Sequence, residues 1–398
     1  MHLKIVLILT VGLALASLFG YLSYRAKLSP ILGYLLAGYA IGPYSPGFVA
    51  DLALSEQLAE IGVVLMMFIV GLQFKAKDLL NVKHVAIPGA LVQTLIAAAV
   101  SAGLVYAAGW TIEAGTVLGL ALGVASTVVL VRLLNDNHLS STRSGHIAIG
   151  WLIVEDAITI VALLTLPVLA HSLQANQFDL TDFAYTLMVC LLKFLALLAL
   201  MATLGRRAIQ FALRRVIITK SNELLTITIL ALTFLVATAS AFVFGTSIAL
   251  GAFLAGMIIG QTDFKHRVSL TFIPLRDTFA AIFFLSIGML FNPVTIRDHY
   301  LLFIAVMGVI FLIKPLAAFL IVTLLKQPLE TKLIVPIALA QIGEFSFILA
   351  EEASKLKILP DSGYDVIIAA AFFSIAFNPI IFRLFSKNLA YKQAYGRS

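Results

Sequence analysis

The sequence has 398 residues, of which 61% are hydrophobic and only 12% are charged, and its formal net charge is +7. Soluble domains carry about 25% charged residues, so the composition excludes a water-soluble globular protein and indicates a polytopic membrane protein. The apolar segments are too long for the alternating ten-residue strands of a membrane barrel, which leaves an all-α fold. We assign the positive charge to basic loops at a membrane and therefore expect no nucleic-acid partner. One cysteine and seven dispersed histidines offer no metal-ligand cluster.

Long apolar windows predict about thirteen transmembrane helices. They cover residues 3–24, 29–43, 57–73, 84–108, 113–134, 146–170, 182–204, 222–242, 246–261, 275–291, 299–325, 332–352 and 363–386. Lys and Arg gather in alternate connections, which identifies those connections as cytoplasmic. The C-terminus is therefore predicted to be cytoplasmic, and the odd number of helices places the N-terminus outside.

Two segments of the chain repeat each other. SPILGYLLAGYAIG (29–42) and SIALGAFLAGMIIG (247–260) agree at eight of fourteen positions, and GLQF (71–74) and GMLF (288–291) follow at a similar distance. The offset spans seven helices, so the second copy crosses the membrane in the opposite direction, as in many secondary transporters. Glycines four residues apart in both copies indicate close helix packing. We expect a first repeat at 1–170 and a linker helix with a basic cytoplasmic loop at 171–221. A second repeat follows at 222–388 and a cytoplasmic tail at 389–398.

A few charged residues fall near the middle of predicted membrane helices. Glu155 and Asp156 are neighbours in WLIVEDAITIVALL, and Lys314 and Glu344 lie in later helices. Such charges cost about 2.5 kcal/mol or more to insert and usually mark function. Adjacent helical residues point about 100° apart, so one acid can pair with Lys314 while the other faces an ion path. The sequence leaves open which acid does which.

A carboxylate in this setting suits a proton-coupled carrier. Burial favours its protonated form, while a nearby ammonium or a bound cation restores the charge. One carboxylate can then hold a proton or a cation, but not both. Asp156 is the predicted exchange residue. Lys314 compensates charge, and Glu155 either pairs with Lys314 or carries a second proton.

Two predicted helices in matching places of the repeats carry interruption signals. GVASTVVL contains Ser126 and Thr127, and QIGEF contains Gln341, Gly343 and Glu344. An unwound backbone exposes carbonyl groups and half-helix ends to an ion. We therefore predict cation or proton ligands at Ser126 and Thr127, although such hydroxyls often bond only to the preceding turn. The QIGEF residues are predicted to brace the crossing of the two helices.

Several motifs around the acid pair resemble one family. LAEIGVVLMMFIVGL, SPILGYLLAGYAIGP, LGAFLAGMIIG, FFLSIGML and AQIGEFSFILA are similar to the monovalent cation:proton antiporter-2 family, above all its Kef-type members, over residues 11–385. The resemblance implies the sodium/proton-antiporter fold, with two crossed broken helices and a dimerisation domain. It also implies a homodimer in a bacterial inner membrane that exchanges K⁺ or Na⁺ for protons by elevator-like alternating access, without a cofactor. The ion-binding aspartate of the family matches Asp156 in this sequence. The lysine that pairs with an acid in the family matches Lys314, and the threonine in its first broken helix matches Thr127.

The chain departs from this family at two points. Potassium efflux members often have Gln at the place of Glu155, and electrogenic sodium exchangers have Asp there, so the resemblance leaves the cation and the stoichiometry open. Many Kef-type proteins continue into a nucleotide-binding regulatory domain, and no Gly-rich phosphate loop follows a strand here. We therefore expect either that the protein lacks this domain or that the sequence is truncated, and a separate cytoplasmic regulatory domain or subunit is a candidate partner.

Two other classes of transport protein remain as alternatives. A ligand-gated cation channel would pass cations without moving protons and would need no titratable pair. A sodium-coupled organic-solute symporter would need a roomier cavity, richer in polar residues.

Overall fold

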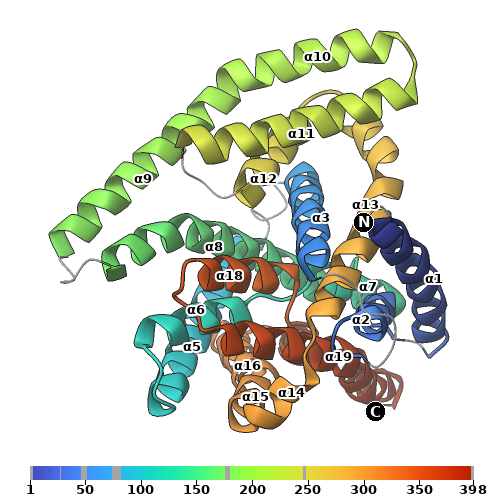
Figure 1. Cartoon of the computed structure of the whole chain (residues 1–398). Helices are drawn as coiled ribbons and strands as arrows, with labels where there is room; N and C mark the ends of the chain where they lie inside the picture. The colour runs from blue at the N-terminus through green and yellow to red at the C-terminus, as the bar shows by residue number, and fades with distance from the viewer. Residues whose placement is uncertain are drawn as a thin grey trace. The chain divides into compact units, whose positions relative to one another are not determined.

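The computed structural model describes residues 3–26, 28–45, 52–73, 82–174, 180–244 and 248–395. Over these ranges its regular elements are all helices, and no strand occurs among them (Figure 1). In chain order they are α1 (Leu3–Arg25), α2 (Pro30–Ile41), α3 (Leu52–Gln73), α5 (Lys83–Ala107), α6 (Ile112–Gly123), α7 (Thr127–Asp136), α8 (Arg143–Gln174), α9 (Leu180–Leu200), η1 (Met201–Gly205), α10 (Arg206–Ile218), α11 (Asn222–Phe244), α12 (Ile248–Gly260), α13 (Lys265–Leu290), α14 (Pro293–Asp298), α15 (Tyr300–Gly308), η2 (Val309–Ile313), α16 (Lys314–Leu324), α17 (Leu329–Ala338), α18 (Glu344–Lys355) and α19 (Asp361–Tyr395), where η marks a π-helical turn.

The helices confirm a polytopic membrane fold. Within the described ranges, six are long and apolar enough to cross a membrane. They span Val6–Arg25, Lys83–Ala107, Arg143–Leu173, Asn222–Phe244, Tyr300–Leu324 and Asp361–Phe385. Shorter apolar helices fill other predicted spans. The spans predicted at 113–134 and 332–352 are each divided into two helices, α6 with α7 and α17 with α18, as the interruption signals indicated.

Helical structure also continues into the basic segment that follows α9. α10 occupies part of the stretch expected to form a loop. Ile209 and Leu213 lie four residues apart and are buried, while Arg214 and Arg215 are exposed. This spacing makes an amphipathic helix, so the apolar residues can be covered while the arginines stay accessible.

The chain divides into two compact units. The first comprises residues 1–50, 76–162 and 287–398, and the second comprises 51–75 and 163–286. The described residues of the predicted ion site all belong to the first unit. Its core includes a cluster of buried side chains from α5, α7, α8, α16 and α17. Trp151 lies in this cluster, fully buried and one helical turn before Glu155, so packing fixes the rotation of α8 at the acid pair.

Within the second unit, α12 packs closely on α3 through a glycine. A Cβ atom added at Gly256 would lie 1.9 Å from the carbonyl oxygen of Phe68 and 2.8 Å from the amide nitrogen of Leu72. These neighbours are backbone atoms, which cannot turn aside as a flexible side chain can. Small residues at such places allow membrane helices to approach closely.

Replacing this glycine tests the packing. Gly256→Ala is expected to lower the unfolding midpoint of the purified protein in detergent, because overpacking typically costs about 1–3 kcal/mol. Gly103→Ala in α5 is the matched control, since a Cβ there meets no atom within 4 Å. Equal midpoints for the two variants would contradict the proposed close contact.

Candidate functional site

The first broken helix is interrupted between α6 and α7. α6 ends at Gly123, and Val124 and Ser126 both have extended backbones. The Ser126 hydroxyl accepts a hydrogen bond from the Val129 amide at 3.3 Å and so caps the start of α7. The break therefore places the positive end of a half-helix inside the first unit.

The second broken helix is interrupted between α17 and α18, beside the first break. Gly343 is the extended N-cap of α18, and its amide donates to the Ser346 hydroxyl at 3.4 Å. That hydroxyl donates in turn to the Ala121 carbonyl of α6 at 2.6 Å. A Cβ atom at Gly343 would lie 2.6 Å from the Cα atom of Ser126. Gly343 is thus needed because two backbones meet at this point.

The Gln341 side chain ties the two breaks together. Its Oε1 accepts from the Ser126 amide at 3.0 Å, and its Nε2 donates to the Ser126 carbonyl at 3.2 Å. The side chain is fully buried. Gln341 therefore bonds to both backbone polar groups of Ser126, which is the arrangement that a brace at the crossing would need.

Glu155 is held against the first break. It is fully buried, and its Oε2 accepts from the Ala125 amide at 2.9 Å. Its Oε1 accepts from Nε2 of Gln93 in α5 at 2.6 Å, and the same Nε2 lies 3.4 Å from the Gly123 carbonyl. A carboxylate is favourable here because it faces a backbone amide at the positive end of α7.

Lys314 places a buried positive charge at the second break, as Glu155 places a carboxylate at the first. It is fully buried at the start of α16, directly after the π-helical turn η2. Its Nζ donates to the Gln341 carbonyl at 3.1 Å, just beyond the C-terminal, negative end of α17. The charges of Lys314 and Glu155 also interact across this interior. A buried acid and a buried base thus serve opposite half-helix ends.

Asp156 and Thr127 lie beside this framework. Asp156 follows Glu155 in α8, so its side chain points about 100° away, and it is 6% exposed. Thr127 is the first residue of α7, and its buried hydroxyl has no hydrogen-bond partner in the part of the chain that the structure describes. A buried polar atom of this kind calls for an explanation such as water or an ion. The side chain of Glu344 lies outside the described residues.

Sequence reasoning missed the amides and hydroxyls that complete the site. Gln93 reaches Glu155, and Asn378 of α19 donates to the carbonyls of Ile337 and Ala340 at 2.7 and 3.1 Å. Ser374, one turn before Asn378, accepts from the Ile342 amide at 3.5 Å. Neutral polar residues in the middle of apolar helices were the available signal.

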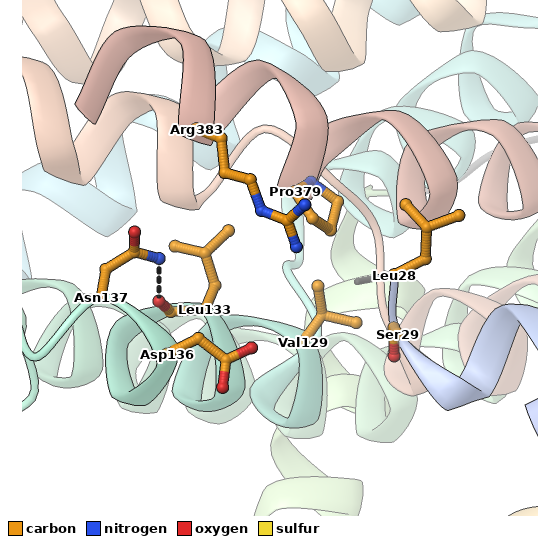
Figure 2. Close-up of a pocket in the computed structure, with 8 residues that line it drawn as sticks. All are labelled: Leu28, Ser29, Val129, Leu133, Asp136, Asn137, Pro379 and Arg383. Atoms are coloured by element: carbon orange, nitrogen blue, oxygen red, sulfur yellow. Dashed lines mark hydrogen bonds between the residues drawn. The ribbon is translucent and has the colours of Figure 1, made fainter. Parts of the chain in front are cut away.

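A small surface pocket lies at the opposite end of α7 (Figure 2). It encloses about 30 Å³, and Figure 2 shows Arg383 of α19 and Asp136 of α7 on opposite sides of it. The buried side chains of Val129 and Leu133 also line it and lie between Ser126 and Asp136 along α7. The predicted ligands Ser126 and Thr127 lie at the N-terminal end of α7 and do not line this pocket.

Exchange of Gln341 tests whether the crossing depends on its amide. Gln341→Met keeps a similar length but leaves the Ser126 amide buried and unpaired, at a cost of about 1–3 kcal/mol. The Ser126 carbonyl keeps its hydrogen bond from the Leu130 amide. We expect a clear fall in the unfolding midpoint measured in detergent. The control is Gln327→Met, because the Gln327 side chain donates to the carbonyl of Leu325, two residues away, and ties no distant segments together. Similar midpoints for both variants would show that the amide does not hold the crossing.

Known proteins share this architecture. The family model described as "Sodium/hydrogen exchanger, transmembrane" matches residues 13–387. A solved structure of the sodium proton antiporter MjNhaP1 from Methanocaldococcus jannaschii aligns with a TM-score of 0.68, covering 94% of each chain at 16% identity. This likeness confirms the predicted sodium/proton-antiporter fold.

Curated relatives agree with the family match. The chain is 43% identical over 392 residues to "Putative cation/proton antiporter YbaL" of Escherichia coli (strain K12), covering 98% of this chain and 70% of that protein. It is 31% identical over 368 residues to K(+) efflux antiporter 4 of Arabidopsis thaliana, covering 92% of this chain and 61% of that protein. These relatives confirm the resemblance to cation:proton antiporters of the Kef type. The chain belongs to the family of transmembrane sodium/hydrogen exchangers.

Proposed function

We propose that the protein is a secondary antiporter that exchanges a monovalent cation, K⁺ or Na⁺, for protons. The observation that carries the proposal is the pair of broken helices whose ends are served by Glu155 and Lys314. Because Glu155 and Lys314 both bond to backbone groups at the breaks, we assign the exchange of cation and proton to the adjacent Asp156. Membrane transporters of several folds bind their ions at such unwound helices.

Asp156 and Thr127 are the proposed ligands. The carboxylate and the buried hydroxyl supply oxygen atoms, with Ser126 beside them at the break. When the cation leaves, a proton on Asp156 removes a bare charge from a setting where it is costly. Binding of cation and proton at one carboxylate is mutually exclusive, so the two fluxes are coupled.

The chain architecture is proposed to be an inverted repeat, with copies at 1–170 and 222–388 joined by a linker at 171–221 and followed by a tail at 389–398. Reciprocal packing supports this proposal. The second-copy helix α12 packs through Gly256 on α3 of the first copy. The first-copy helix α2 meets Gly288 of α13, where a Cβ atom would lie 2.2 Å from the Leu35 carbonyl oxygen.

We further propose alternating access of the elevator type in a homodimer. The membrane is proposed to be a bacterial inner membrane. The arrangement of Lys and Arg supports a cytoplasmic C-terminus and an external N-terminus. Regulation by a cytoplasmic domain or separate subunit remains part of this proposal.

The exchange itself can be measured in proteoliposomes. A cation gradient is expected to drive opposite proton movement, read with a pH-sensitive dye, and Asp156→Asn is expected to abolish it because an amide cannot be protonated and released in this way. Asp136→Asn makes the same chemical change outside the site and should retain activity. Full exchange by the Asp156 variant would refute the proposal, and cation flux without proton movement would identify a channel.

The cation is proposed to be K⁺ in the first instance. The relatives named for K(+) efflux are 31% and 32% identical, whereas the sodium antiporter supports only the fold. Parallel dye assays with K⁺, Na⁺, Li⁺ and Rb⁺ are expected to give the lowest half-saturating concentration for K⁺. A lower value for Na⁺ would assign the protein to sodium exchange.

A further inference from the structure

Gln93 connects three parts of the site without belonging to either broken helix. It lies in α5, it is fully buried, and its Nε2 is 2.6 Å from Oε1 of Glu155 and 3.4 Å from the Gly123 carbonyl oxygen. One amide group therefore contacts both the buried acid and the last residue of α6.

The surroundings determine the orientation of this amide. Nitrogen and oxygen of a Gln side chain are assigned from the hydrogen bonds they make. Here the terminal group faces two acceptors, the Glu155 carboxylate and the Gly123 carbonyl. A flipped amide would place its own oxygen against both, so the NH₂ group is fixed as the donor.

Both oxygens of Glu155 consequently face donors. The Ala125 amide donates to Oε2 at 2.9 Å, and its N–H is part of the backbone and cannot become an acceptor. An ionised carboxylate only accepts hydrogen bonds, whereas a protonated carboxyl group must also donate one. The hydrogen bonds that the structure gives these two oxygens all come from donors, so a proton on Glu155 would find no acceptor among them.

We propose that Gln93 is a positioning residue that keeps Glu155 ionised throughout the transport cycle. The inference rests on the proposed antiport function. Asp156 is then the exchanging carboxylate: as a cation arrives, the O–H bond of its carboxyl group breaks, the proton leaves to water and the carboxylate binds the cation. One proton moves against one monovalent cation, and the cycle carries no net charge.

Loss of the Gln93 donor should change this charge balance. In Gln93→Met a side chain of similar length remains, but Oε1 of Glu155 loses its partner. The ionised form of Glu155 then loses a hydrogen bond that stabilises it, so Glu155 takes up a proton more readily. Two protons would move per cation in a fraction of cycles, so each cycle would carry up to one elementary charge.

The experiment measures charge movement in proteoliposomes with a K⁺ gradient while the membrane potential is held at different values. The unaltered protein is expected to exchange ions at a rate independent of the potential and without net current. Gln93→Met is expected to give a current and a dependence on potential. The double variant Gln93→Met with Glu155→Gln should return to current-free exchange, because no titratable group remains at position 155. Gln327→Met is the matched control and should behave as the unaltered protein does.

The outcomes separate this inference from the proposed function. Net charge movement by the unaltered protein, with exchange lost in Asp156→Asn, would overturn the role of Gln93 and leave antiport standing. Exchange that survives in Asp156→Asn would overturn the antiport mechanism itself. Current-free exchange by Gln93→Met would also overturn the inference, as would a current that persists in the double variant. If the Gln93 variant fails to fold, the potential dependence of the unaltered protein still decides.

Discussion

The site depends on one constraint: backbone groups that leave a helix inside a membrane must find partners within the protein. Two helices break beside each other here, so backbone N–H and C=O groups near residues 123–126 and 337–343 bond to side chains. Side chains from four other helices meet this need. Glu155 and Lys314 supply charges, while the amides of Gln93 and Asn378 and the hydroxyl of Ser374 supply neutral partners.

The same constraint explains why the two breaks are joined so tightly. Gln341 bonds to both the amide and the carbonyl of Ser126, and Ser346 bonds to the carbonyl of Ala121. Each contact links the second broken helix to the first. A shift of one break would leave buried groups of the other unpaired, at about 1–3 kcal/mol each. The pair is therefore expected to move as one body during transport.

Much of the site was predictable because charges and breaks in apolar helices are conspicuous. Glu155, Asp156 and Lys314 are costly at membrane depth, and the segments around Ser126 and Gln341 carry clear interruption signals. Gln93 and Asn378 escaped notice because a neutral amide is cheaper to bury than a charge. The close contact between Gly343 and the Ser126 backbone could not be predicted from the sequence either, because it forms between segments more than 200 residues apart. Local patterns carry no information about such a meeting.

The adjacency of the two acids follows from this division of work. Consecutive positions on α8 place two carboxylates at the same depth but about 100° apart. Glu155 can therefore face the backbone amide of Ala125 while Asp156 points elsewhere. The partners of a fixed charge must hold it firmly, whereas an exchanging group must release its proton and its cation in turn. One carboxylate cannot both hold a fixed charge and exchange its ligands. Two adjacent carboxylates within one turn of α8 can divide these two roles.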